Sequence, residues 1–205
     1  MLITAALAGP SPDLLDLAIA RFTAIQSYRV TLHSSHADGE EHLHYFYRKP
    51  GHIRMEFIRP HNGAVLVYDP VTRRVRLWPF GEGRFPQLNL SPDNRLIRSP
   101  RGQQVDRSDV GALLGNVKAL GQGGTFTVHE KLLLDERSTL FIDVVGNGSY
   151  SITDVHRYEL WLDAGTLFPV KVVSHDRNGA VLETVRMENV EINPDLPPTL
   201  FQPQD

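Results

Sequence analysis

Short turns between segments of alternating polarity are the feature that most constrains this chain. From residue 28 onward, apolar and polar residues alternate with a period of two, as expected for β-strands that bury one face. Sequences rich in Gly, Pro, Asn and Asp interrupt the alternation, for example "ADGE" (37–40) and "PHNG" (60–63). Connections this short join antiparallel neighbours, because a parallel pair needs a crossover of about a dozen residues or more. The sequence therefore predicts an antiparallel meander.

Two blocks of five strands and two helices follow from this pattern. Strands are expected at 28–37, 41–49, 52–59, 63–69, 73–79, 125–134, 138–146, 156–163, 168–176 and 179–192. Apolar residues at helical spacing predict helices over 13–26 and 106–120, with Ser11 capping the first and Ser108 or Asp109 capping the second. The fold class is therefore α+β, dominated by antiparallel sheet.

Two irregular segments complete the chain. Residues 81–103 are rich in Gly, Pro and Arg and show no period, so they predict a long loop of the functional or mobile kind. The tail, 193–205, carries several prolines and is expected to lie across the sheet.

A sheet of about ten strands must curl strongly or close on itself. Its apolar inner surface would then be covered by only two modest helices and a loop, which leaves room for a cavity suited to lipid chains. The alternative is that the helices and tail fill this space and make a dry core. The predicted cavity-lining residues are Leu43, Tyr45, Tyr47, Ile53, Met55, Phe57, Val65, Val67, Leu77, Leu160, Leu162 and Val170.

Composition excludes several classes of protein. With 205 residues, 41% of them hydrophobic, the chain can bury a sizeable core. A net charge of -3 with mixed signs argues against nucleic acid as a partner. The absence of cysteine excludes disulfides, thiolate zinc sites and a thiol nucleophile.

The first twelve residues contain a short apolar run, "LITAALAG", that ends in small residues. This run resembles the end of a secretory signal without its basic start, and it is too short to span a bilayer, which needs about 20 apolar residues. We therefore expect 1–12 to be a signal remnant or flexible N-terminus, and 13–205 to form a single domain of an exported protein.

Catalytic and metal-binding patterns are weak. His42 and His44 share a strand face and could bind zinc or copper with a third histidine, but His33 and His36 are expected on opposite faces. The chain has no G-x-S-x-G motif, and its "GQGG" (121–124) lacks the Lys-Ser/Thr of a phosphate-binding loop. We therefore expect no metal site, no cofactor and no enzymatic activity.

Two long stretches are similar to a known family. Residues 45–79, "YFYRKPGHIRMEFIRPHNGAVLVYDPVTRRVRLWP", show a basic residue and Pro, a strand with alternating aromatics, and a second Pro before a short turn. Residues 158–202 are predicted to form hairpins, and "LPPTLF" follows the last of them. These motifs follow a predicted helix that runs into "SYRVTLH". Taken together in this order, they resemble the LolA/LolB-like superfamily of periplasmic lipoprotein-localisation factors.

The resemblance implies a strongly curved, unclosed antiparallel β-barrel of about 10–11 strands, with helices covering a hydrophobic cavity. It implies that the protein carries acyl chains of lipoproteins or other lipids through the periplasm, as a monomer that meets envelope membrane proteins. A related branch senses envelope stress with the same fold, so a sensor or scaffold that binds a protein partner is the alternative.

Arg48 and Lys49 are the residues that the resemblance places at the cavity rim, where carriers usually have Arg before the first Pro. Lys at this position departs from the family, as does Asp69-Pro70 where the family has Asp-Gly. The chain also lacks the anchoring cysteine of an outer-membrane receptor.

Overall fold

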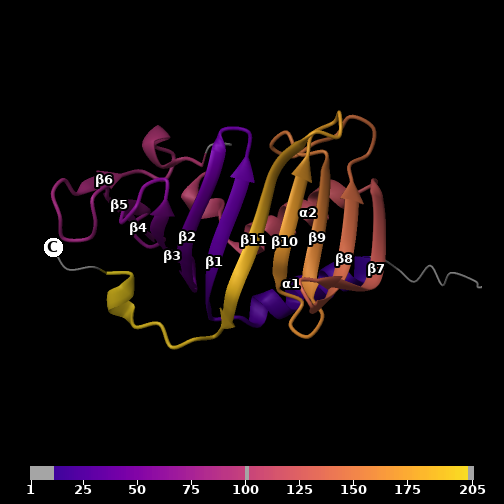
Figure 1. Cartoon of the computed structure of the whole chain (residues 1–205), viewed down its shortest axis with the longest axis horizontal. Helices are drawn as coiled ribbons and strands as arrows, with labels where there is room; N and C mark the ends of the chain where they lie inside the picture. The colour runs from indigo at the N-terminus through magenta and orange to yellow at the C-terminus, as the bar shows by residue number, and fades with distance from the viewer. Residues whose placement is uncertain (1–11, 100–101, 203–205) are drawn as a thin grey trace, which may run out of the picture.

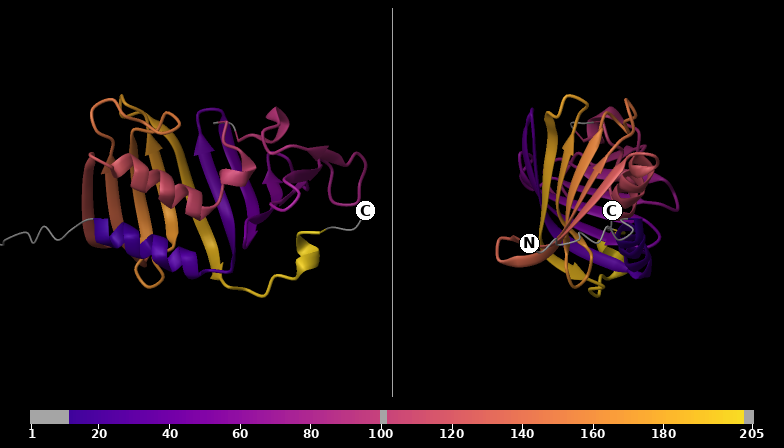
Figure 2. Two further views of the ribbon diagram at one scale, coloured as in Figure 1. Left: turned by 180° about the vertical axis from the view of Figure 1, so that it is seen from behind. Right: turned by 90° about the vertical axis from the view of Figure 1, so that its right-hand side faces the viewer.

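A single antiparallel sheet curves around two helices (Figures 1 and 2). The computed structural model describes residues 12–99 and 102–202. Its 11 strands lie in the order β6-β5-β4-β3-β2-β1-β11-β10-β9-β8-β7, so β6 and β7 are the two edges and the barrel is not closed. The predicted curved, unclosed antiparallel barrel is confirmed.

The strands are β1 Ser27–His36, β2 Gly39–Arg48, β3 His52–Arg59, β4 Val65–Asp69, β5 Arg74–Trp78, β6 Leu88–Leu90, β7 Thr125–Leu134, β8 Arg137–Val145, β9 Arg157–Asp163, β10 Pro169–His175 and β11 Val181–Ile192. All ten predicted strands are present, and β6 is an additional one inside the expected loop. Two meanders, β1–β6 and β7–β11, are joined in the middle of the sheet by β1 and β11, which pair from Tyr28↔Ile192 to His36↔Glu183.

Helix α1 (Pro12–Ala24) lies along the concave surface of the sheet (Figure 2). It buries Leu15 and Ala18 in the main hydrophobic core, and Phe22 packs against the same core. The predicted cap Ser11 and the expected signal remnant lie outside the described residues, apart from Pro12 itself.

Helix α2 (Val110–Gly121) begins later than predicted, because residues Val105–Arg107 form a separate turn of 3-10 helix, η2. Of the two expected caps, Asp109 is the one used: its carboxylate accepts hydrogen bonds from the backbone N–H groups of Gly111 and Ala112. Gly111 permits close packing on α1, since a Cβ there would lie 2.6 Å from a ring carbon of Phe22. No helix in the described part of the chain is long and apolar enough to cross a membrane.

The tail runs past the lower ends of the first strands (Figure 1) and packs on the outer side of β4 and β5, away from the concave face. After β11 it runs to a 3-10 turn, η3 (Pro198–Leu200), and buries Leu196 and Phe201 against Val65, Val67 and Trp78. Arg54 fastens this turn, because its guanidinium donates to the carbonyl of Leu200 (3.1 Å) while also pairing with Glu56 (2.7 Å) and Glu82 (2.5 Å).

The prediction that Val65 and Val67 face the inside of the barrel is wrong. In the register of β3 and β4, Met55 is opposite Leu66 and Ile53 is opposite Tyr68, so Leu66 and Tyr68 face inward. Residues 64–68, "AVLVY", are apolar throughout because the tail covers the outer side of β4. The sequence pattern therefore contains no alternation from which the inward face of β4 could be read, and a shift of one residue exchanges the two faces.

Candidate functional site

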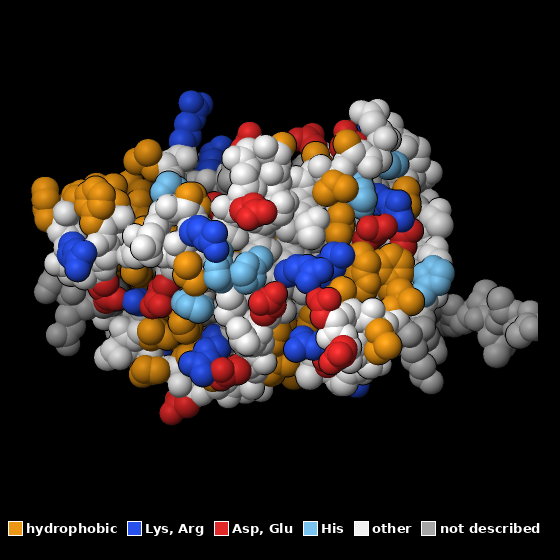
Figure 3. All heavy atoms as spheres, in the orientation of Figure 1, with side chains coloured by type: hydrophobic (Ala, Val, Ile, Leu, Met, Phe, Trp, Pro, Cys, Tyr) orange, Lys and Arg blue, Asp and Glu red, His pale blue; other side chains and the backbone are white. Residues whose placement is uncertain are grey.

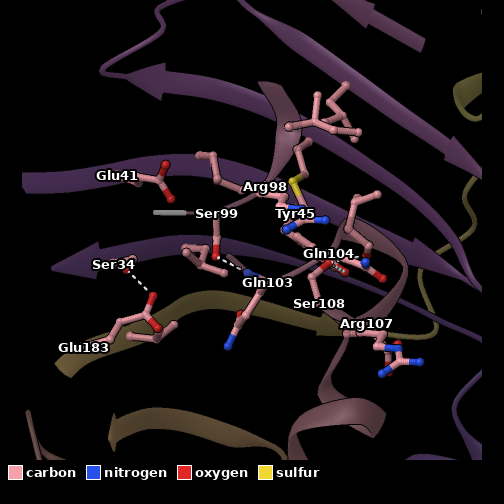
Figure 4. Close-up of a pocket in the computed structure, with 18 of the residues that line it drawn as sticks. Ser34, Glu41, Tyr45, Arg98, Ser99, Gln103, Gln104, Arg107, Ser108 and Glu183 are labelled. Atoms are coloured by element: carbon pink, nitrogen blue, oxygen red, sulfur yellow. Dashed lines mark hydrogen bonds between the residues drawn. The ribbon is translucent and has the colours of Figure 1, made fainter. Parts of the chain in front are cut away.

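A cavity of about 340 Å³ lies between the concave face of the sheet and residues from the ranges 96–99 and 103–116 (Figure 4). Most of its sheet wall consists of inward-facing apolar side chains: Leu32, Leu43, Tyr45, Met55, Phe57, Leu66, Leu77, Tyr158, Val172, Val185 and Met187. Its other wall includes Leu96, Ile97, Val105, Val110 and Leu113. This volume is at the lower end of the range of about 300–1,000 Å³ that is usual for small-molecule sites.

The position of the two helices explains why this space stays open. Both lie over the half of the sheet that runs from β7 to β11 (Figure 2, left). Over β2–β5 the cover is the segment that carries η1 (Arg95–Ile97) and η2, which is irregular and presents fewer apolar side chains than a helix face. The cavity therefore forms where helical cover ends.

Two tyrosines from the sheet hold the start of α2 beside the cavity. The hydroxyl of Tyr45 lies 3.2 Å from Oγ of Ser108, and that of Tyr28 accepts a hydrogen bond from the backbone N–H of Val110 (3.3 Å). Their rings stack with centroids 5.9 Å apart. Burial raises the pKa of both phenols, so both are neutral and act through hydrogen bonds alone.

One end of the cavity is polar. Ser34, Glu41, Ser174 and Glu183 line it there, and the hydroxyl of Ser34 donates to Oε1 of Glu183 (2.6 Å). Burial raises the pKa of the Glu41 carboxyl; His36 and His61 oppose this rise, and the negative charge of Glu183 adds to it. Figure 4 shows Ser34, Glu41 and Glu183 at one end of the cavity, away from Gln104, Arg107 and Ser108.

Five of the twelve residues predicted to line a cavity do so: Leu43, Tyr45, Met55, Phe57 and Leu77. Five others, Tyr47, Ile53, Leu160, Leu162 and Val170, are buried but do not line the cavity. Tyr47 illustrates the reason: its ring lies against Tyr28 and against Phe22 of α1, and burial raises its pKa to about 12. Helix α1 covers this part of the concave face, so no open space remains beside Tyr47.

Arg48 and Lys49 are not at the cavity rim, so that prediction is wrong. Strand β2 runs from the polar end of the cavity at Glu41 toward α1, and the two basic residues lie at its far end. There the ammonium group of Lys49 donates to the carbonyl of Thr23 in the last turn of α1, which is a favourable place for a cation.

Several cavity residues were not predicted. Leu32, Val185 and Met187 come from the central pair β1 and β11, and the alternation of β11 could have identified two of them. Residues 96–109 lie in and just after the segment that the sequence predicts to be a functional or mobile loop, but nothing in its sequence indicates which side chains face the sheet.

The histidines near the first hairpin are divided between the two faces, as expected. His33 and His42 stack on the convex face with ring centroids 3.8 Å apart, whereas His36 points to the concave side. Among residues 12–99 and 102–202, no group of three or more His, Cys, Asp or Glu side chains is arranged to hold a metal ion. On the convex face, charged and histidine side chains are intermixed across the middle of the sheet (Figure 3).

Comparison with known proteins gives similarity in structure only. No protein-family model matches the chain, and no curated protein matches it in sequence. An uncharacterised conserved protein from Thermus thermophilus is similar in structure, with a TM-score of 0.58 and 12% identity over 96% of this chain and 95% of that one.

Two further solved structures share the architecture. The Mycobacterium tuberculosis lipoprotein LppX has a TM-score of 0.52 and 12% identity over 91% of this chain and 98% of its own. The Pseudomonas aeruginosa MucA/MucB complex gives a TM-score of 0.53 and 13% identity over 96% of this chain, which spans 62% of the matched chain. Identities this low show the fold alone, and that fold is the curved, unclosed antiparallel sheet with helices on its concave face that the sequence predicts.

Proposed function

We propose that this protein binds acyl chains of a lipid or lipoprotein in the cavity and carries them within the bacterial envelope, without catalysis. The observation that carries the proposal is the cavity itself, whose sheet wall is apolar except at the end lined by Ser34, Glu41, Ser174 and Glu183. Apolar concave surfaces are where hydrocarbon chains bind.

The energetics suit a carrier. Each buried methylene group contributes about 0.8 kcal/mol, so a chain segment of several methylenes is retained firmly and still leaves when a competing apolar surface is offered. A space of about 340 Å³ suits one chain, or part of one, rather than several chains at once. Capture and release of an acyl chain require no proton transfer and no nucleophile, which is why we propose a non-catalytic role.

Transport in the periplasm, as a monomer that exchanges cargo with envelope membrane proteins, is the finer form of this proposal. It is supported by the resemblance of residues 45–79 and 158–202 to the lipoprotein-localisation factors and by the fold shared with the lipoprotein LppX.

Binding of a protein partner is the second candidate function. The solved MucA/MucB complex favours it, because a chain of similar fold is there assembled with another protein. A protein-binding scaffold needs no open interior, however, so the cavity makes the lipid-binding proposal the stronger of the two.

Mass spectrometry of organic extracts from natively purified protein tests the proposal, together with displacement of a fluorescent fatty-acid probe. Met55, which lines the cavity from β3, provides the variant: Met55→Asp places a carboxylate on the apolar wall and should weaken lipid retention about tenfold or more. Met55→Leu is the matched control and should retain lipid.

The melting temperature separates binding from folding. We expect Met55→Asp to lose lipid much more than it loses stability, because the side chain faces open space. Recovery of no lipid from the wild-type protein, with no displacement of the probe, would contradict the proposal. Loss of stability alone would make Met55 an ordinary core residue.

A further inference from the structure

Strongly exposed aromatic side chains are concentrated in one connection of the sheet. Residues 79–87 join β5 to β6 at the end of the molecule (Figures 1 and 2), and within them Phe80 and Phe85 are 63% and 92% exposed. Side chains this exposed contribute little to the core, and in Figure 3 hydrophobic side chains gather at the same end. Two exposed phenylalanines in one short connection indicate a surface that contacts something outside the chain.

Contacts with neighbouring segments hold this connection in place. The carboxylate of Glu82 accepts a hydrogen bond from the guanidinium of Arg54 (2.5 Å), which is 7% exposed. The backbone N–H of Arg84 donates to the carbonyl of Gly81 (3.0 Å), and a Cβ on Gly81 would lie 3.5 Å from the carbonyl oxygen of Gly63 in the β3–β4 connection. The two phenylalanines are therefore presented by an ordered turn, so little further ordering is needed when a partner buries them.

The cavity opens beside this connection. Four of the described residues that line it are exposed: His61, Leu96, Arg98 and Arg107. His61 belongs to the β3–β4 connection, which lies against residues 79–87 at Gly63, and Pro79 lines the cavity itself. Leu96 is 73% exposed, although the next residue, Ile97, packs against the core. The cavity mouth and the exposed phenylalanines therefore share one end of the molecule.

Arginines outnumber carboxylates around these apolar side chains. The arginines in residues 79–98 are all exposed: Arg84, Arg95 and Arg98. The first lies between the two phenylalanines in the sequence, and the other two lie on either side of Leu96. Of the two carboxylates in the same range, Asp93 and Glu82, the second is paired with Arg54 of β3. These segments therefore carry positive charge, whereas the whole chain has a net charge of -3.

We propose that residues 79–87 and 95–98 form a docking surface for a bilayer of anionic phospholipid. The side chains of Phe80, Phe85 and Leu96 enter the interface, and the three arginines contact headgroup phosphates. This inference rests on the proposed lipid binding and names the surface at which an acyl chain is exchanged. Apolar side chains that insert and cations that meet anionic headgroups are the two components of interfacial binding. With the cavity mouth at the bilayer surface, a chain passes between bilayer and cavity without exposing its methylene groups to water.

Flotation with large unilamellar vesicles tests the docking surface. We expect the wild-type protein to partition onto vesicles of equal parts phosphatidylglycerol and phosphatidylcholine about tenfold more strongly than onto phosphatidylcholine alone, and added salt should reduce this difference. Phe80→Ser combined with Phe85→Ser should weaken partition onto the anionic vesicles about tenfold or more, because two apolar side chains no longer enter the interface. Both residues are exposed and neither lines the cavity, so the melting temperature and binding of the fluorescent fatty-acid probe should stay unchanged.

Leu133→Ser is the matched control. Leu133 is 76% exposed, but it lies in β7 at the opposite edge of the sheet, so this variant should partition like the wild-type protein. Equal partition of the wild-type protein onto anionic and neutral vesicles would overturn the inference. Partition of the double variant that equals that of the wild type, or a loss as large in Leu133→Ser, would overturn it too.

Binding of the fatty-acid probe separates this inference from the proposed function. A wild-type protein that binds the probe but no vesicles would overturn the docking surface and leave lipid binding intact, and the exposed phenylalanines would then serve a protein partner. A wild-type protein that does not bind the probe would overturn the proposed function, and with it the exchange of acyl chains at this surface.

Discussion

The hydroxyl of Tyr45 lies 3.2 Å from the hydroxyl of Ser108, and this contact joins the inner wall of the cavity to the segment that covers it. Ser108 donates its own proton to the carbonyl of Val105 (2.7 Å), so Tyr45 is the donor between the two hydroxyls. The contact joins β2 to the residue just before the cap of α2, so it ties the covering segment to the sheet.

Removal of this hydroxyl should loosen the cover at a measurable cost. We expect Tyr45→Phe to lower the free energy of unfolding by about 1 kcal/mol, because one buried hydrogen bond is lost while Ser108 keeps its bond to Val105. Urea denaturation measures the change. Tyr150→Phe, at a position that is 48% exposed, is the control and should change stability by less than about 0.5 kcal/mol. A Tyr45→Phe protein as stable as the control would mean that the contact does not hold the segment in place.

Two phenylalanines distinguish the role of the tail from that of the exposed loops. Phe201 is 2% exposed and packs on Val65, Val67 and Trp78, whereas Phe85, in the β5–β6 connection, is 92% exposed. We expect Phe201→Ala to cost about 3–5 kcal/mol of unfolding free energy and Phe85→Ala to cost almost nothing.

Ligand binding provides the second readout for this pair. Because the tail covers the convex face, folded Phe201→Ala protein should still bind the fluorescent fatty-acid probe with unchanged affinity. A weakened affinity at a temperature where the variant remains folded would show that the convex cluster and the cavity are coupled.

Substitutions of Leu43 and Leu160 test whether side chains that line the cavity are less tightly packed than those in the rest of the core. Both are buried on the concave face, at 4% and 0% exposure, but only Leu43 lines the cavity. Leu160→Ala should cost about 2–5 kcal/mol, as in a packed core. Leu43→Ala should cost less and should weaken probe binding, since its side chain already faces open space. Equal losses of stability with no effect on the probe would mark Leu43 as ordinary core.

Sequence alternation predicted the architecture and many of the inward-facing residues. In β2, β3 and β9 the turns and the two-residue period agree, and Leu43, Met55 and Leu160 face inward as predicted. In β4 the same argument failed, because the tail covers its outer side and both of its faces are apolar. A one-residue ambiguity was enough to place Val65 and Val67 on the wrong side.

Which part of the concave face remains open could not be predicted from the strands. It depends on where α1 and α2 lie and on the pairing of β1 with β11, which brings together residues such as Ser34 and Glu183, 149 positions apart in the sequence. Long-range contacts of this kind leave no local pattern in the sequence. For the same reason the pair of Glu41 and Glu183 could not be recognised before the strands were assembled.

The raised pKa of Glu41 leads to a prediction about stability and pH. Burial favours the neutral form of the Glu41 carboxyl in the folded protein. The folded state therefore binds this proton more tightly than the unfolded chain, in which the pKa of the carboxyl is about 4.5. Stability should therefore fall as the pH rises from this value through the higher pKa of the folded state, and above that point the full cost of the buried charge is present.

We expect Glu41→Gln to be more stable than the wild-type protein in urea at pH 8 and to show no such gain at pH 4, where the carboxyl is largely neutral in both states. Part of the charge is solvated, which keeps the gain modest, and the exposed Glu40→Gln serves as the control. A gain that is larger at pH 4 than at pH 8 would mean that the folded protein stabilises Glu41 as a carboxylate, and the prediction would be wrong.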